Sequence, residues 1–318
     1  MADLPTVVDT VLDRTVALGY GRLGFQIRNR WWTPLPPDAL RGRTALVTGA
    51  NSGIGKAIAT GLAGLGAAVT MAVRDPARGA LAAADIVAAV PDARLTVELC
   101  DVSDLSDVWR FAVDQLDAGD RLDLLIHNAG VLPAARTESP QGHESCLATH
   151  ILGPVLLTEL LAPALARAEN GRVITVSSGG MYTQRLPVDD FEYRGGDYRG
   201  ATAYARTKRM QVALTPVLAE RYAGQGISVH CMHPGWVDTP GVAASLPRFR
   251  ALTGPLLRTP AEGADTALWL AATDVPSGRF WHDRRARPEH YLPWTRETRA
   301  DRERLWRWCA AAAGVPVG

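Results

Sequence analysis

Short apolar runs and longer alanine- and leucine-rich stretches alternate along the chain from about Arg43 onward. The apolar runs are continuous and rich in valine, isoleucine or leucine, as is typical of parallel strands that are buried on both faces. We expect strands at 44–48, 68–73, 94–99, 122–127, 172–177 and 227–232. The stretches between them predict helices at 57–66, 77–90, 104–116, about 145–168 and 201–222. Such alternation predicts right-handed crossovers and one doubly wound α/β sheet.

Two segments lie outside the alternating unit, so we divide the chain into 1–41, 42–282 and 283–318. The first part has an amphipathic helical pattern at Val7, Val8, Val11, Leu12 and Thr15. We expect this N-terminal helical extension and linker to dock on the core or on a partner subunit, because its aspartates oppose anionic lipid. A peripheral membrane contact stays open. The C-terminal extension interleaves arginines with acids, which is typical of a solvated helix face. Near its end the main unit has a last predicted helix, which begins at a capping box formed by Thr259 and Glu262, with Pro260 at the first helical position.

Composition excludes several classes of protein. The 318 residues are 47% hydrophobic and 21% charged, which favours a packed core over disorder. Because 34 basic residues nearly balance 33 acidic ones, we expect no nucleic-acid partner. Apolar runs end well short of the ~18 residues of a membrane span, and the first residues lack the basic segment of a secretory signal. The four widely spaced cysteines contain no CxxC pair, which indicates a reducing compartment, and we expect a cytoplasmic protein.

The loop after the first predicted strand is rich in glycine and reads Thr48-Gly49-Ala50-Asn51-Ser52-Gly53-Ile54-Gly55-Lys56. Glycines allow the backbone to approach a pyrophosphate, and the helix that follows directs its amides and the positive end of its dipole at the phosphates. The position of the loop between a strand and a helix distinguishes it from an ordinary tight turn and predicts a dinucleotide site. The expected cofactor-binding residues here are Thr48, Gly49, Asn51, Ser52, Gly53, Ile54 and Gly55.

The end of the second strand predicts which dinucleotide binds. Sites that prefer NAD place an acid there for the ribose 2′-hydroxyl, whereas NADP sites place a cation near the 2′-phosphate. Here Val73 is followed by Arg74, whose guanidinium suits a phosphate, and Lys56 can add a second charge. Asp75 lies one step past the strand end and is expected to point away. We therefore expect NADP(H) in preference to NAD(H); a solvated Arg74 is the alternative.

Two further strands end in polar or small residues at the same edge of the predicted sheet. Asp101 and Val102 follow the third strand, and Asn128, Ala129 and Gly130 follow the fourth. Folds of this kind bind their ligand at the carboxyl edge. We expect Asp101 to accept a hydrogen bond from the adenine amino group, and Asn128 and Gly130 to hold the loop beside the ribose.

A tyrosine and a lysine one helical turn apart form the candidate acid–base pair. Tyr204 and Lys208 share one face of a predicted helix, and the chain has only one other lysine, Lys56. The unperturbed pKa of tyrosine is about 10, and a neighbouring cation lowers it. Ser178, at the end of the fifth strand, can hydrogen-bond a substrate oxygen as negative charge develops on it.

Five motifs occur in the order found in the short-chain dehydrogenase/reductase superfamily: TGANSGIGK, HNAG, VSS, YARTK and PGWVDTPG. The chain resembles this family over about residues 43–282, and its retinol-dehydrogenase-like branch in particular. The resemblance implies a single Rossmann-type doubly wound parallel sheet, with 42–282 as the dinucleotide-binding catalytic domain. It also implies hydride transfer between a nicotinamide and a carbonyl or alcohol carbon.

The resemblance assigns roles to individual residues. Tyr204 is similar to the family's catalytic acid, Lys208 to the residue that lowers its pKa, and Ser178 to the serine that polarises the substrate. The segment that contacts the nicotinamide carboxamide is matched by Pro234, Gly235, Val237 and Thr239. Family members are often homodimers or homotetramers built on the helices with the tyrosine motif, although the extra termini of this chain could block those faces.

The chain departs from the family pattern at His150, where the family usually has an asparagine whose backbone holds a water linked to the active-site lysine. Since the helper group is partly main chain, His150 can substitute for it or join the proton relay itself. The alternative to an enzyme is a catalytically silent NADPH-binding scaffold or redox sensor. An insertion at 186–200 also separates Ser178 from Tyr204, as it does in the retinol-dehydrogenase-like branch.

The segment after Thr239 predicts a hydrophobic carbonyl or alcohol as substrate, because in this fold it closes over the substrate. It contains Val242, Leu246, Phe249, Leu252 and Leu256 with Arg248, Arg250 and Arg258. No metal site is expected, since alternation along a buried strand directs His230 and His233 to opposite faces. His127 is interpreted as a packed strand-end residue.

Overall fold

An eight-stranded sheet organises the part of the chain that the computed structural model describes, residues 4–15, 17–119, 121–241, 250–251 and 253–316. Its strands are β1 (Thr44–Thr48), β2 (Ala68–Val73), β3 (Arg94–Leu99), β4 (Leu124–His127), β5 (Arg172–Val176), β6 (Ser228–Met232), β7 (Arg279–His282) and β8 (Arg285–Ala286). Their order is β3-β2-β1-β4-β5-β6-β7-β8, and every pair is parallel except β7 with β8. The strand order reverses between β1 and β4, and such a switch point is where doubly wound sheets bind ligands.

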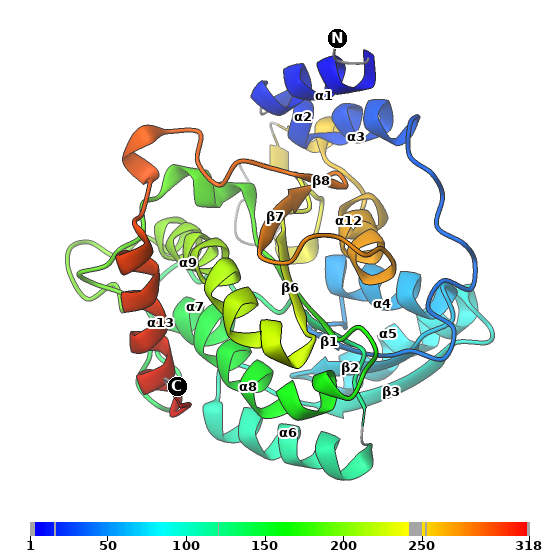
Figure 1. Ribbon diagram of the computed structural model, residues 1–318, viewed down its shortest axis with the longest axis horizontal. Helices are drawn as coiled ribbons and strands as arrows, with labels where there is room; N and C mark the ends of the chain where they lie inside the picture. The colour runs from blue at the N-terminus through cyan, green and yellow to red at the C-terminus, as the bar shows by residue number, and fades with distance from the viewer. Residues whose placement is uncertain (1–3, 16, 120, 242–249, 252, 317–318) are drawn as a thin grey trace.

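Helices cover both faces of the sheet (Figure 1). One face packs against α4 (Gly53–Gly64), α5 (Pro76–Ala89) and α12 (Pro260–Ala272), and the other against α6 (Leu105–Ala118), α8 (Gly153–Ala166) and α9 (Gly200–Tyr222). The capping box predicted at Thr259 is confirmed, with both of its reciprocal hydrogen bonds to Glu262. The predicted doubly wound α/β fold is likewise confirmed. The short strands β7 and β8 were not predicted, because four residues beginning with an arginine make no continuous apolar run.

The helix expected at about 145–168 contains a change of helical type. It starts as α7 (Ser145–Leu147), passes through the π-helical turn η1 (Ala148–Leu152) and continues as α8. By length and composition Ser145–Ala166 could cross a membrane, with a mean hydropathy of 1.5, but 78% of its most apolar stretch is buried inside the protein. This burial is typical of a core helix. The π-helical turn holds His150, and such turns occur frequently at functional sites.

The N-terminal extension consists of α1 (Leu4–Arg14), α2 (Ala17–Tyr20) and α3 (Arg22–Asn29). Figure 1 shows these helices in blue at one end of the molecule, near β7, β8 and α12. In an amphipathic helix the apolar side, here with Val7 and Val11, ordinarily faces the surface on which the helix docks. Instead Asp9 and Asp13 face the protein, while Val7 and Val11 are 49% and 58% exposed. The acidic face of α1 therefore docks, because arginines of the C-terminal segment pair with it.

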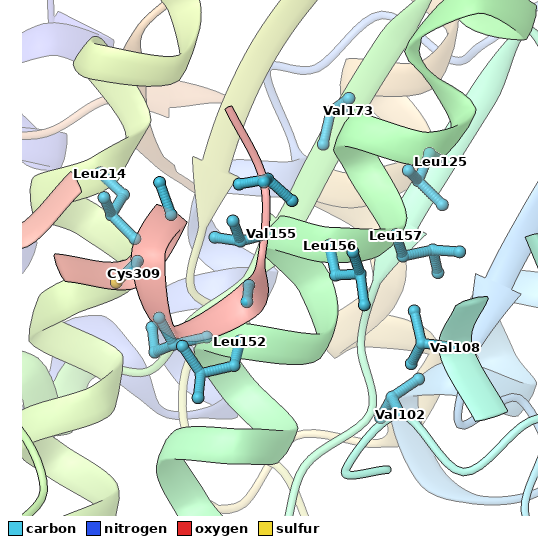
Figure 2. Close-up of a cluster of buried hydrophobic side chains, with 14 of the residues drawn as sticks. Val102, Val108, Leu125, Leu152, Val155, Leu156, Leu157, Val173, Leu214 and Cys309 are labelled. Atoms are coloured by element: carbon cyan, nitrogen blue, oxygen red, sulfur yellow. The ribbon is translucent and has the colours of Figure 1, made fainter. Parts of the chain in front are cut away.

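The C-terminal extension ends in α13 (Arg299–Ala313), which packs on α8 and α9 (Figure 1). Its buried face joins the core cluster of that side of the sheet, and Figure 2 shows Cys309 beside Leu214 of α9. The expectation of a solvated arginine-rich face fits Arg299 but is wrong for Arg284 and Arg287. Arg284 binds Asp265 of α12, and Arg287 binds Asp9 of α1, so both guanidinium groups are paired and largely buried.

Candidate active site

A cleft of about 950 Å³ opens at the carboxyl ends of the strands, on both sides of the switch point. It is lined by most of the residues that the sequence motifs had singled out. These are Gly49, Asn51, Ser52, Gly53, Ile54, Gly55, Arg74, Asp101, Val102, Asn128, Ala129, Gly130, Ser178, Tyr204, Lys208, Pro234, Gly235, Val237 and Thr239. Two predicted residues, Thr48 and His150, lie outside this lining and are 1% exposed.

The glycine-rich loop packs so closely that side chains are excluded from it. A Cβ atom on Gly49, which has φ +66°, would lie 2.9 Å from the Cα of Ala129. A Cβ atom on Gly55 would lie 2.3 Å from the Asn128 Nδ2. The loop leads directly into the first turn of α4, where the side chain of Ser52 makes no capping hydrogen bond. The loop thus brings bare backbone and a helix N-terminus to the cleft, as phosphate binding requires.

Thr48 and Asn128 join the loop after β1 to the loop after β4. The Thr48 Oγ1 accepts hydrogen bonds from the backbone amides of Asn128 and Ala129, at 3.0 and 3.1 Å. In return the Asn128 Nδ2 donates to the carbonyls of Thr48 and Gly49, at 3.0 and 3.3 Å. Thr48 therefore acts from beneath the cleft by fixing the two loops that line it.

Two arginines lie at the end of the cleft beside β2. Arg74 and Arg78 are exposed lining residues, and within the described residues neither guanidinium forms an ion pair. Asp75 is occupied elsewhere, because its carboxylate caps α5 by accepting hydrogen bonds from the amides of Ala77 and Arg78. Lys56, expected to add a second charge, instead forms an ion pair with Asp85. Arg78 lines the cleft and Lys56 does not; the position of Arg78 three residues after Asp75, in the first turn of α5, could have indicated this.

At the other end of the cleft Ser178, Tyr204 and Lys208 converge. The Lys208 Nζ donates to the Val176 carbonyl at 2.8 Å and lies 5.4 Å from the centre of the Tyr204 ring. Burial lowers the pKa of Lys208 to about 8. Burial also raises the pKa of Tyr204, and a hydrogen bond with Ser178 opposes that rise. Lys208 is not among the groups that shift the pKa of Tyr204 in the chain alone, so the expected lowering by this lysine is not seen there.

The two serines after β5 have different orientations. The Ser177 hydroxyl is buried and donates to the Lys208 carbonyl at 2.9 Å. The Ser178 hydroxyl accepts from the Gly180 amide at 3.2 Å and interacts with Tyr204. Ser177 thus supports the helix that bears Lys208, and Ser178 is the serine available to a ligand.

His150 fixes the framework behind Tyr204. The Val131 amide donates to its Nε2 at 3.0 Å, so the neutral ring has its proton on Nδ1, which donates to the Thr207 Oγ1 at 2.8 Å. Burial, reinforced by the charge of Lys208, holds the pKa of His150 well below its usual range. The His150 carbonyl accepts from the Gln211 Nε2 at 3.1 Å. The ring thus connects the loop after β4 to α9, and both of its nitrogens are occupied.

The comparison with known families agrees with this geometry. The sequence profile of the short chain dehydrogenase family matches residues 43–248. The chain belongs to this family. It is 40% identical to the dehydrogenase/reductase SDR family member 12 of Bos taurus over 294 residues, which cover 90% of this chain and 91% of that protein. The resemblance to the retinol-dehydrogenase-like branch is confirmed: identity with retinol dehydrogenase 11 of Mus musculus is 34%, covering 74% of this chain and 75% of that one.

A solved short chain dehydrogenase from Shigella flexneri, crystallised with NADP, has the same architecture. It superposes with a TM-score of 0.64 at 25% identity, covering 79% of this chain and 100% of that one. The short chain dehydrogenases are oxidoreductases that use a nicotinamide cofactor, and this chain is one of them.

The cleft of this short-chain dehydrogenase also has an apolar wall, whose residues were not among the predicted site residues. Val131, Leu132 and Trp236 contribute to it. Trp236 lies within the PGWVDTPG motif, so its position could have been inferred. Of the segment expected to close over the substrate, Val242, Leu246, Arg248, Phe249 and Leu252 lie outside the described residues. Arg250 forms an ion pair with Asp238, Leu256 is exposed, and Arg258 is fully buried away from the cleft.

The histidines considered for a metal site have other partners. His230 contacts Ser228, and His233 stacks on His282. His127, interpreted as a packed strand-end residue, is buried and hydrogen-bonds Thr158. A second group, Glu289, His290 and Glu297, has its potential ligand atoms within 4.8 Å of one another. Arg302 binds both of those carboxylates, and Arg209 binds Glu297, so ion pairs explain this group.

Proposed function

We propose that this short-chain dehydrogenase is an NADP(H)-preferring carbonyl reductase or alcohol dehydrogenase that acts on a hydrophobic substrate. The proposal rests on one observation: Ser178, Tyr204 and Lys208 converge in the cleft that also contains the glycine-rich loop. The apolar wall at Val131, Leu132 and Trp236 supports a hydrophobic substrate. Retinol dehydrogenase 11, a relative in the same branch, is named for retinol, and this supports a hydrophobic substrate here too.

The residues of the cleft suit a nicotinamide dinucleotide. The loop from Gly49 to Gly55 would hold the pyrophosphate, Asp101 the adenine, and Gly235 to Thr239 the carboxamide end. When bound, the nicotinamide supplies or accepts the hydride. Gly49 and Gly55 allow this loop to pack against the loop after β4, since a Cβ atom at Gly49 would collide with Ala129 and one at Gly55 with Asn128.

The chain's own groups then handle the substrate oxygen and its proton. Ser178 would hydrogen-bond the oxygen; in reduction the Tyr204 hydroxyl would give its proton to that oxygen and become a phenolate, and in oxidation the Tyr204 phenolate would take the proton from the substrate hydroxyl. Lys208, held by the Val176 carbonyl, places an ammonium group near the tyrosine, where it favours the phenolate. The expected cost of Tyr204→Phe is therefore a loss of turnover with retention of cofactor binding.

The first test is NADPH oxidation by the wild type and Tyr204→Phe over a panel of apolar aldehydes, ketones and quinones. Turnover that collapses in the variant supports the assignment, and equal activity of the two proteins contradicts it. Tyr182→Phe is the matched control, because Tyr182 donates to the Pro288 carbonyl and does not line the cleft.

NADP preference is proposed from Arg74 and Arg78. A 2′-phosphate would form charge-assisted hydrogen bonds with these guanidinium groups, and such bonds contribute roughly 1.5–3 kcal/mol. Replacing both arginines with alanine should weaken NADPH binding about 10- to 100-fold and leave NADH binding nearly unchanged. Titration calorimetry with both cofactors measures this, with Arg304→Ala as a control far from the cleft. Equal losses for NADPH and NADH would contradict the preference.

A second candidate function, a silent NADPH-binding scaffold, is favoured by one contact. The His150 carbonyl, which in the family would hold a water near the lysine, already accepts from Gln211. A scaffold would bind NADPH tightly without turnover, and Gln211→Leu, which frees the His150 carbonyl, would then restore activity.

A further inference from the structure

The loop after β6, which forms one wall of the cleft, is held on both sides by backbone from distant parts of the chain. The amide of Trp236 donates to the Tyr20 carbonyl at 2.8 Å. The Trp236 carbonyl accepts from the Arg258 amide at 2.7 Å, and the Asp238 amide donates to the Arg258 carbonyl at 2.9 Å. Trp236 thus lies between the N-terminal extension and the segment that enters α12.

The side chain of Arg258 joins the same three segments. Its guanidinium is 1% exposed and forms a two-point ion pair with Asp283, at 2.6 and 2.8 Å. It also donates to the carbonyls of Gly19 at 3.1 Å and Gly21 at 3.2 Å in the extension, and to the Pro234 carbonyl at 3.3 Å in the loop. Because a guanidinium is planar and its donors are fixed in direction, all of these partners are held in one geometry.

A second buried arginine connects this group to the helices of the extension. The Arg28 Nη1 donates to Asp283 at 2.7 Å and to the Gly19 carbonyl at 2.6 Å, and its Nε donates to Asp9 at 2.6 Å. Asp9 in turn accepts from Arg287. The buried charges therefore run without interruption from α1 to the loop beside the cleft.

Tyr20 brings the extension against both cleft segments. Its ring packs on His233 with centroids 4.6 Å apart, and a Cβ on Gly179, next to Ser178, would lie 2.9 Å from its Cε2. Gly235 has φ +80°, and a Cβ there would lie 2.6 Å from both the Arg258 Nε and the Tyr20 carbonyl oxygen. The close approach of the extension thus requires glycine at Gly235, which lines the cleft, and at Gly179, which is next to the lining residue Ser178.

We infer that the docked N-terminal extension holds the loop at 234–241 in the position that the cleft needs. Arg28, Asp283 and Arg258 are the positioning residues that connect the extension to this loop. The inference deepens the proposed function and rests on it for its kinetic consequence. Loosening the ion network leaves the glycine-rich loop, Tyr204 and Lys208 untouched. It releases Trp236 and the backbone expected to meet the nicotinamide end of the cofactor.

The test uses the full chain with Arg28→Lys and, at the far end of the network, Asp9→Asn. Arg22→Ala is the matched control, since Arg22 lies on the same extension but forms only a half-exposed ion pair with Glu262. Hydrogen exchange read by mass spectrometry should show faster exchange in the peptide containing the Trp236 amide for both variants, and no change for the control. Well below the melting temperature, kcat/KM should fall roughly 10- to 100-fold, because small displacements of positioning groups have effects of that size.

Two failures are distinguishable. If the wild type turns over substrate and both variants match Arg22→Ala in Trp236 exchange and in kcat/KM, the extension only adds stability and the inference is wrong. A lower melting temperature with unchanged Trp236 exchange contradicts it as well. If no protein turns over any substrate, the proposed function fails, while faster exchange at Trp236 in the two variants still supports the positioning role.

Discussion

The N-terminal helices and the C-terminal helix α13 differ in the interactions that hold them to the rest of the chain. The N-terminal helices dock through buried ion pairs, in which Arg28, Asp283 and Arg258 are each at most 2% exposed. The C-terminal helix α13 docks through apolar side chains, among them Leu305 and Cys309, which are fully buried against α8 and α9. The ionic contact lies beside the cleft, whereas the apolar contact lies on the scaffold.

The difference indicates a difference in role. Apolar packing has little directional preference and tolerates exchange of similar side chains, so it suits a helix that stabilises the core. Buried ion pairs depend on geometry and lose their benefit when one partner moves. We therefore expect conservative substitutions in the N-terminal contact to lower the free energy of unfolding more than conservative substitutions in the C-terminal contact do.

The largest expected effect is at Asp283. Asp283→Ala leaves the guanidinium groups of Arg28 and Arg258 buried without their shared partner, and breaking a buried pair in this way costs about 3–5 kcal/mol. Urea unfolding followed by circular dichroism measures the change. Asp238→Ala breaks an exposed pair with Arg250 and should leave the unfolding free energy unchanged. A loss at Asp283 no larger than at Asp238 would show that the network contributes little.

Leu305→Ala should have the next largest effect, about 2–5 kcal/mol, since it opens a cavity under α13. The informative comparison is with two conservative changes. Leu305→Met should cost less than about 1.5 kcal/mol, whereas Asp283→Glu should remain strongly destabilising, because the longer side chain cannot keep both arginine contacts. Similar losses for the two conservative variants would remove the distinction between the extensions.

Acid should weaken the fold through buried histidines near the N-terminal contact. Burial lowers the pKa of His282 to about 3 and that of His233 well below its usual range. Between pH 6.5 and 3 the unfolded chain binds a proton at His282 and the folded chain does not, so stability falls as pH falls, by about 1.4 kcal/mol for each pH unit. The pKa of Asp283 is lowered, so its contribution persists over the same range.

Unfolding free energies at pH 6.5 and 5 measure this dependence, and His282→Gln should remove the contribution of one proton from it. His143→Gln is a fitting control, because His143 is only partly buried and lies near Trp308 at the C-terminal side. An unchanged pH dependence in His282→Gln would mean that the ring is protonated in the folded protein.

The smallest expected effect is at the start of α13. Thr298 caps this helix: its Oγ1 accepts from the Asp301 amide, and the Asp301 carboxylate accepts from the Thr298 amide. Thr298→Ala should cost about 1 kcal/mol, the usual price of a lost N-cap. Thermal unfolding measures it, and Thr298→Ser, which keeps the hydroxyl, should show almost no change. A cost equal to that of Leu305→Ala would contradict a docking based on apolar contacts.

The sheet and the cleft could be predicted because their signals are local. Continuous apolar runs predicted β1, β2 and β3 with their observed bounds. The glycine-rich loop was predicted from the spacing of its glycines directly after β1. The N-terminal contact could not be predicted in this way. An amphipathic pattern assigns Val7 and Val11 to the core, and the arginines that pair with Asp9 reverse that assignment; two of them, Arg285 and Arg287, are distant in sequence. The pairing of Lys56 with Asp85 was hidden for the same reason.

The ion pair between Arg28 and Asp283 spans 255 positions of sequence. During synthesis Arg28 and Asp9 are therefore made long before Asp283 and Arg287, so the ion pairs that anchor the extension cannot form until the chain has been made past β8. A chain that stopped short of β7 would have the glycine-rich loop and Tyr204 but would lack Asp283. Arg28 and Arg258 would then have lost the shared partner through which the N-terminal extension is anchored beside the cleft.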